Sequence, residues 1–307
     1  MPTYEFVQLD VFTSRPLEGN QLAVFTDARG MSDEQMQALA REMNLSETTF
    51  VIPRDEPTEA REGVRVRIFT VAEELPFAGH PTLGTATLLR SRRGSPAQIT
   101  LDLRVGKVPL TFEDRGGPLA GDQASPLAFG EMRQRDPQFG AALAREEVAR
   151  AIGIAPEEIA DQWPVQIVST GLPYAIVPFR RLETLTNLKF SLAQAADFLT
   201  RTEPGLFFYF ICPQREGSKL NVRARMIFYG GEDPATGSAA GCCAAWMVRH
   251  GVAHSDEPVM ISQGKEIRRP SEIFVRATRS PNRSEAEVTN VRVGGYAVEV
   301  LSGVVRL

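Results

Sequence analysis

An internal repeat constrains the fold more than any other feature of this sequence. VQLDVFT from Val7 precedes GNQLAVF from Gly19 in the first half, and VQIVSTG from Val165 precedes GLPYAIV from Gly171 in the second. Each pair is followed by a helical pattern and a further strand-like run, TTFVI in the first half and FFYFI in the second. Because the segments recur in one order, the sequence predicts a strand–helix unit that is built twice with a pseudo-twofold relation.

The repeat continues into two short motifs. HPTLGTA begins at His80, and DPATGSA begins at Asp233 at the corresponding place in the second half. An aspartate accepts hydrogen bonds from the free N–H groups of a helix's first turn, and a proline at the first helical position has no N–H to lose. Asp233-Pro234 therefore predicts a helix start, and His80-Pro81 predicts the matching start in the first half.

Neither of these two predicted helices has a polar face. Residues 83–89 and 239–245 are apolar or very small on all sides, so both helices must be buried all round. The rest of the chain is mostly strand-like, and its clearest helical patterns span 33–43, 145–152 and 192–199. We therefore expect a highly curved sheet around a central helix, built twice.

The length of the chain fits two domains. At 307 residues it can form two domains of ordinary size. The Gly- and Pro-rich segment 116–130 breaks all periodicity and is the best candidate for a linker. The sequence predicts an N-terminal domain over residues 1–130 and a C-terminal domain over residues 131–289.

Charge and composition exclude several classes of protein. The net charge is −4 and no long Lys/Arg block occurs, so nucleic acid is not an expected partner. The N-terminus has no signal-peptide pattern and no apolar run reaches 18 residues, so we expect a cytoplasmic protein without a membrane segment. Cys212, Cys242 and Cys243 have neither CxxC spacing nor a His at ligand spacing, which predicts buried reduced thiols and no metal site.

The paired motifs suggest a binding site. If the two halves face each other, both helix N-termini point into the cleft between them. Two positive dipole ends and free N–H groups there suit a carboxylate or an enolate-like oxygen. His80, Asp233 and Ser238 would lie at the mouth of this cleft. The alternative is that these residues are helix caps and nothing more.

Four segments carry a family resemblance. FAGHPTLGTA, EDPATGSAA, NLSETTFV and the closing VRVGGYAVEVLSG resemble the phenazine-biosynthesis PhzF-like isomerases, in the family's order along essentially the whole chain. The resemblance implies the α+β diaminopimelate epimerase-like fold, with two pseudo-symmetric domains that each wrap a curved, barrel-like mixed β-sheet around a central α-helix. It also implies that a C-terminal strand within 290–307 returns to the first domain, that no cofactor is needed, and that the protein is a homodimer.

The resemblance also assigns roles to residues. Glu47 matches the family's general acid/base, and His80 and Asp233 match the residues that hold and help to protonate the substrate. Moving a proton between carbons needs one group of tunable pKa and donors where negative charge develops. The implied function is an isomerase that acts on a small unsaturated or hydroxylated carboxylic acid in the cleft. The positions matching substrate contacts are Gly79, Gly237 and Ser238.

Departures from related patterns leave alternatives open. Racemases of this fold use two opposed cysteines, but Gly79-His80 and Asp233-Pro234 occupy those places here, so a two-thiol racemase is excluded. Arg268 replaces a usual glycine, and the approach to the second motif over 228–232 is short, which puts the substrate's identity in doubt. Two other functions remain possible: a Ser238 hydrolase with His80 and Asp233 as a triad, and a ligand-binding protein that has lost catalysis.

Overall fold

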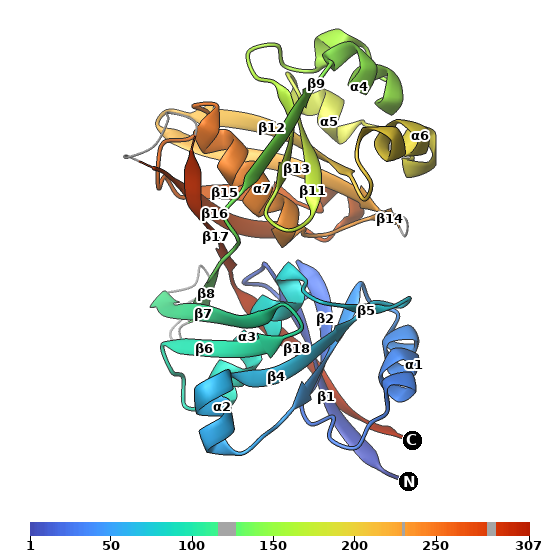
Figure 1. The fold of residues 1–307 in the computed structure, drawn as a ribbon, viewed down its shortest axis with the longest axis vertical. Coiled ribbons are helices and arrows are strands. Elements are labelled where there is room, and N and C mark those ends of the chain that lie inside the picture. The colour runs from blue at the N-terminus through green and yellow to red at the C-terminus, as the bar shows by residue number, and fades with distance from the viewer. Residues whose placement is uncertain (116–126, 229–230, 281–286) are drawn as a thin grey trace. The chain divides into compact units, whose positions relative to one another are not determined.

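The chain forms two compact units in a computed structural model that describes residues 1–115, 127–228, 231–280 and 287–307 (Figure 1). Unit 1 comprises Met1–Met132 and Gly294–Leu307, and unit 2 comprises Arg133–Val293. The sequence had predicted 1–130 with a returning strand from 290–307, and 131–289. Within the predicted linker, 116–126 lie outside the described residues. The linker prediction is wrong for 127–130, because these residues belong to strand β8, which pairs with β7.

Unit 1 is a mixed sheet whose central helix, α3, packs against strands β1, β2, β3, β6 and β18. Strands β18 and β1 pair antiparallel, β1 and β2 antiparallel, β2 and β3 parallel, β3 and β4 antiparallel, β4 and β6 parallel, and β6 and β7 antiparallel. The elements are β1 (Thr3–Val11), β2 (Asn20–Phe25), α1 (Asp33–Met43), β3 (Glu47–Ile52), α2 (Glu56–Glu62), β4 (Val64–Phe69), β5 (Glu74–Leu75), α3 (Gly79–Arg92), β6 (Gln98–Leu103), β7 (Gly106–Arg115), β8 (Leu127–Arg133) and β18 (Ala297–Arg306).

Unit 2 repeats this plan around α7. Strands β9 and β10 pair antiparallel, β10 and β11 antiparallel, β11 and β12 parallel, β12 and β13 antiparallel, β13 and β15 parallel, and β15 and β16 antiparallel. The elements are β9 (Gln138–Leu143), α4 (Arg145–Ile152), η1 (Pro156–Glu158), β10 (Val165–Ser169), β11 (Pro173–Pro178), α5 (Leu182–Thr186), α6 (Leu192–Thr202), β12 (Phe207–Glu216), β13 (Lys219–Phe228), β14 (Gly231–Glu232), α7 (Gly237–Arg249), β15 (Val259–Gln263), η2 (Lys265–Ile267), β16 (Ser271–Arg279) and β17 (Val288–Gly295).

The predicted repeat is confirmed by these pairings. Both units follow the same succession of antiparallel and parallel pairs, and in both the central helix connects a two-residue return strand to the next long strand. Residues 79–86 of α3 are all buried, as are residues 239–248 of α7, so both helices are enclosed as predicted. The three cysteines are free and buried, also as predicted.

The predicted helix starts are wrong in detail. Helix α3 begins at Gly79, which places His80 and Pro81 inside its first turn, where a proline removes no intrahelical hydrogen bond. Helix α7 begins at Gly237 with Thr236 as its N-cap, so Asp233 lies before the helix and does not cap it. The carboxylate of Asp233 accepts a hydrogen bond from the Thr236 hydroxyl at 2.5 Å instead. None of the helices in the described ranges is long and apolar enough to cross a membrane.

Candidate active site

Glu47 and His80 lie together in unit 1. Glu47 is the first residue of β3, and His80 lies in the first turn of α3. Glu47 Oε2 is 3.5 Å from His80 Nε2, and the two side chains are only 16% and 6% exposed. The positive end of the α3 dipole lies beside this carboxyl group and favours its negative charge. Two of the predicted catalytic residues are thus brought into direct contact.

The imidazole of His80 is uncharged. Burial lowers its pKa to about 3, and a hydrogen bond to the backbone of Gln21 opposes this shift only in part. Among the described residues Nε2 has no hydrogen-bond partner, so the donor to the Gln21 carbonyl is Nδ1. This bond fixes the tautomer with the proton on Nδ1. Nε2 therefore presents a lone pair to Glu47, and a proton carried by Glu47 can be donated to it.

Two contacts between elements hold this pair in place. Glu47 faces Leu22 across the parallel pair of β3 and β2, next to the Gln21 carbonyl that orients His80. The buried hydroxyls of Thr49 on β3 and Thr85 on α3 form a hydrogen bond of 2.9 Å. The strand that carries Glu47 and the helix that carries His80 are therefore fixed to each other.

Asp233 lies in unit 2 in a segment held by Gln263. The fully buried Gln263 donates from Nε2 to the Asp233 carbonyl at 2.8 Å and to the Thr236 hydroxyl at 2.9 Å. Its Oε1 accepts from the Thr236 N–H at 3.3 Å and from the hydroxyl of Tyr209 at 3.0 Å. Gly264 passes so close that an added Cβ would lie 2.6 Å from the Pro234 carbonyl oxygen. The carboxylate of Asp233 is thus oriented through Thr236 by a buried network.

Ser238 and Gly237 occupy the first turn of α7. The Ser238 hydroxyl shares a hydrogen bond of 2.8 Å with the hydroxyl of Tyr174 on β11. The buried Gly237 carbonyl accepts from Gln134 Nε2 at 3.0 Å. In unit 1 the corresponding first residue of α3, Gly79, is buried as well.

The six predicted site residues therefore form two groups, one in each unit. Gly79, His80 and Glu47 belong to unit 1, and the other three, Asp233, Gly237 and Ser238, belong to unit 2. The catalytic-triad alternative gains no support, because the nitrogens of His80 face Glu47 and Gln21, whereas Ser238 bonds to a tyrosine. A serine nucleophile needs a base within hydrogen-bond reach.

Sequence reasoning missed the residues that orient the two groups. The Gln21 carbonyl, Tyr209 and Tyr174 lie in strand-like runs without a chemical motif, and Thr236 lies inside DPATGSA but was not predicted as a site residue. Gln263 was not among the predicted site residues, although a glutamine at the end of a strand-like run and directly before a glycine is itself a useful sign. Thr236 could have been found because it follows Asp233 within the same motif.

The departure at Arg268 has a backbone explanation. Arg268 adopts φ 60° and ψ 28°, a left-handed conformation that favours glycine, which fits the glycine usual in the family. The side chain is exposed. The short approach over 228–232 includes residues 229 and 230, which lie outside the described part of the chain.

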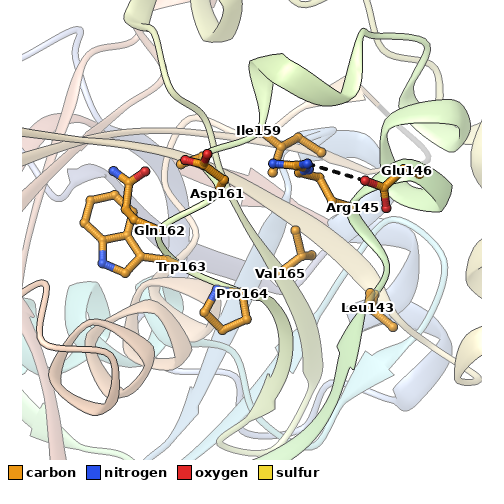
Figure 2. Close-up of a pocket in the computed structure, with 10 residues that line it drawn as sticks. Leu143, Arg145, Glu146, Ile159, Asp161, Gln162, Trp163, Pro164 and Val165 are labelled. Carbon is orange, nitrogen blue, oxygen red and sulfur yellow. Dashed lines mark hydrogen bonds and ion pairs between the residues drawn. The ribbon is translucent and has the colours of Figure 1, made fainter.

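A separate hollow in unit 2 is shown in Figure 2. It measures about 500 Å³, and Arg145 and Glu146 of α4 lie across from Trp163 on its walls. None of the six site residues lines it. In the described part of the chain, no group of three or more His, Cys, Asp or Glu side chains is placed to hold a metal ion.

The fold class follows from these units together with a solved structure. A hydroxyproline epimerase from Agrobacterium vitis matches 99% of this chain and 93% of its own with a TM-score of 0.64, at 12% identity. Identity this low carries the fold alone. The chain has the predicted α+β, diaminopimelate epimerase-like fold.

The family is shown by closer matches. The family model for phenazine biosynthesis-like proteins matches residues 9–303. The chain is 34% identical over 306 residues to the trans-2,3-dihydro-3-hydroxyanthranilate isomerase of Pseudomonas fluorescens, covering 99% of this chain and 100% of that protein. A solved PhzF-family phenazine biosynthesis protein from Bacillus anthracis covers 100% of both chains with a TM-score of 0.83 and 26% identity. The chain belongs to this phenazine biosynthesis-like family, and it is an isomerase.

Proposed function

We propose that this isomerase moves a proton between two carbon atoms of a small unsaturated or hydroxylated carboxylic acid, with Glu47 as the acid/base and no cofactor. The observation that carries the proposal is the contact of Glu47 with a neutral, buried His80. A carboxylate that works on carbon must give up its proton again at a second carbon. The neutral His80 serves that purpose, because it can accept a hydrogen bond from protonated Glu47 without becoming charged itself.

The reaction balances without any other reactant. The carboxylate of Glu47 takes a proton from one carbon, and the electron pair left behind spreads into the adjacent unsaturated system. Glu47 then returns the proton to another carbon of the same system. While Glu47 holds the proton, its hydroxyl donates to His80 Nε2, which keeps the acid oriented. General acid–base catalysis by one positioned group contributes roughly 10²- to 10⁴-fold in rate.

The second group supplies substrate contacts in this proposal. The first-turn N–H groups of α7 and the Ser238 hydroxyl suit the substrate's carboxylate, because helix N-termini favour anions. Asp233, oriented by Thr236, would accept a hydrogen bond from a hydroxyl or amino group of the same molecule. We further propose that one substrate molecule binds to both groups of residues, in a cleft between the units.

Deuterium uptake tests the proposal. Wild type, Glu47→Gln and the surface control Glu42→Gln are incubated in D₂O with trans-2,3-dihydro-3-hydroxyanthranilate, the substrate in the relative's name, and with a panel of small unsaturated acids. Carbon-bound deuterium is read by NMR. We expect uptake by wild type and Glu42→Gln and a loss of at least about 100-fold in Glu47→Gln.

Each result has a distinct meaning. Uptake that survives in Glu47→Gln would remove Glu47 from its role. If wild type incorporated deuterium into none of the acids in the panel but bound one of them tightly, the ligand-binding alternative would be favoured.

We also propose that the protein is a homodimer. Light scattering after gel filtration tests this, and the expected mass is twice 33.8 kDa.

A further inference from the structure

Arg225 of β13 is a buried arginine whose three nitrogens are all engaged. The residue is 8% exposed. Its Nε and Nη2 donate to the two carboxylate oxygens of Glu232 at 2.9 and 2.7 Å. Its Nη1 donates to the carbonyl oxygens of Leu185 and Leu188, each at 2.9 Å, and to that of Thr186 at 3.3 Å. Arg225 therefore ties the end of α5 to the carboxylate of Glu232.

Glu232 is the residue directly before Asp233. It belongs to β14, which has two residues and pairs with the end of β13. The Asp233 N–H continues this pairing by donating to the Met226 carbonyl at 2.9 Å. Such a short strand has few backbone bonds of its own, so the bidentate pair with Arg225 is a major restraint on it. The Glu232 side chain is 9% exposed, which limits screening by water.

Unit 1 contains a matching arginine–glutamate pair, but this pair is further along the chain from the site residue of its unit. Arg67 donates from Nε and Nη2 to the two oxygens of Glu74 at 2.8 and 2.7 Å. In both units the arginine lies two residues before the strand residue that faces the glutamate. Glu232 adjoins Asp233, however, whereas five residues separate Glu74 from His80. Arg67 is thus a matched control for the loss of a bidentate pair.

We infer that Arg225 is a positioning residue of the isomerase and that it acts through Glu232 to fix Asp233. This inference rests on the proposed role of Asp233 at the substrate. Gln263 and Thr236 hold the segment on its helix side. Arg225 and Glu232 hold it on its strand side. Both sides are needed, because a displacement of about 1 Å at a reacting group can cost about 100-fold in rate.

A double-mutant cycle tests the route through Glu232. The variants are Arg225→Lys, Glu232→Gln, the double variant and Arg67→Lys, all in the full-length chain. Lysine keeps the charge but lacks the planar fork that reaches both oxygens. We expect each single variant of the pair to lower kcat about 10- to 100-fold with little change in KM, and the double variant to lower it no further than the stronger single one. Arg67→Lys should keep kcat within about threefold of wild type, because five residues separate Glu74 from His80 and substitutions at separate sites act independently.

Hydrogen exchange provides a readout that does not need turnover. Mass spectrometry of peptides covering 231–240 reports the Asp233 and Thr236 amides, which donate to Met226 and Gln263. Arg225→Lys and Glu232→Gln should speed exchange there about tenfold or more, whereas Arg67→Lys should not. If wild type turned over no substrate, the proposed function would fail, and exchange alone would still decide the role of Arg225.

Three outcomes would overturn the inference. Multiplicative losses of kcat in the double variant would mean that Arg225 acts through the α5 carbonyls and not through Glu232. Exchange over 231–240 that stays at the wild-type rate in Arg225→Lys would mean that Asp233 is held without it. Equal effects of Arg67→Lys and Arg225→Lys on kcat would reduce both pairs to general stabilisers.

Discussion

His80 is uncharged, and its surroundings enforce that form. A buried imidazolium would have to lose its hydration, which is why burial lowers the pKa of His80 to about 3. The Gln21 carbonyl then decides which nitrogen keeps the proton. The consequence for the chemistry is that His80 Nε2 can accept a hydrogen bond from a protonated Glu47 but does not itself supply an acidic proton near neutral pH.

The neutral state of His80 predicts a pH dependence of stability. The unfolded chain protonates this histidine below about pH 6.5, but the folded chain does so only near pH 3, so acidification favours unfolding. The stabilisation is fully present above this window and is lost as the pH falls through it. Between pH 7 and pH 5 the loss from His80 should be about 2 kcal/mol in the free energy of unfolding.

Urea unfolding at pH 7 and pH 5 measures this loss. His80→Asn keeps a donor for the Gln21 carbonyl but does not titrate, so its loss between the two pH values should be about 2 kcal/mol smaller than that of wild type. The exposed His254→Asn is the control for losing an imidazole. An equal pH dependence in wild type and His80→Asn would contradict a neutral His80.

Gln263 predicts a larger effect on stability than a glutamine usually has. Gln263→Met keeps the volume but leaves the Tyr209 hydroxyl, the Thr236 N–H and the Asp233 carbonyl without this partner. Each buried polar group left unsatisfied costs about 1–3 kcal/mol, and we expect a net loss of about 3 kcal/mol in urea unfolding. The exposed Gln214→Met should change the free energy of unfolding by less than about 0.5 kcal/mol. A stable Gln263→Met with normal isomerisation would show that the network is dispensable.

At the element scale, the central helix α7 contains a glycine that lowers its helix propensity but allows close packing. Gly241 lies in the middle of α7, where glycine costs about 1 kcal/mol relative to alanine. A Cβ at this position would lie 1.9 Å from Gln134 Oε1. Gln134 in turn donates to the Gly237 carbonyl and accepts from Thr170. The glycine thus makes room for the side chain that holds the first turn of α7.

This packing predicts non-additive effects of two substitutions. Gly241→Ala should lower the free energy of unfolding by about 1–2 kcal/mol, since displacing Gln134 breaks one buried and one partly buried hydrogen bond while alanine regains helix propensity. In the Gln134→Ala background the collision is gone, and Gly241→Ala should instead stabilise by up to about 1 kcal/mol. Denaturant unfolding of the four proteins measures the coupling. Equal effects of Gly241→Ala in both backgrounds would contradict the predicted collision.

Elements with local stop signals were predictable, and elements set by distant contacts were not. Helix α1 has the predicted bounds because Ser32 and Gln35 form a capping box and Asn44 adopts the left-handed conformation at its end. Helix α7 starts later than predicted because Asp233 is held by Gln263, which lies 30 residues further along the chain. The same reason explains the site: the motifs revealed its residue types, but the strand residues that orient them have no local pattern.

At the scale of the whole molecule, the repeat places one group of candidate site residues in each of two units, and the two units differ in how the chain builds them. Unit 2 is one continuous segment, Arg133–Val293, whereas unit 1 is completed by Gly294–Leu307 from the end of the chain. Strand β18 pairs with β1 along its length, from Thr3 opposite Arg306 to Val11 opposite Ala297. A unit 1 without β18 would expose that edge of β1 and part of the core beneath it.

This difference predicts how fragments behave. Residues 133–293 should fold alone, whereas 1–132 should fold only when 294–307 are joined to them. A short Gly/Ser linker is enough, because a Cβ at Gly294 would lie 2.6 Å from the Gly130 carbonyl oxygen, so the two backbones are adjacent. Circular dichroism and urea unfolding of the three fragments measure this: we expect cooperative transitions for 133–293 and for the joined fragment only. A cooperative transition of 1–132 alone would show that unit 1 folds without β18. The pairing of β18 with β1 would then be expected to matter for function and not for folding.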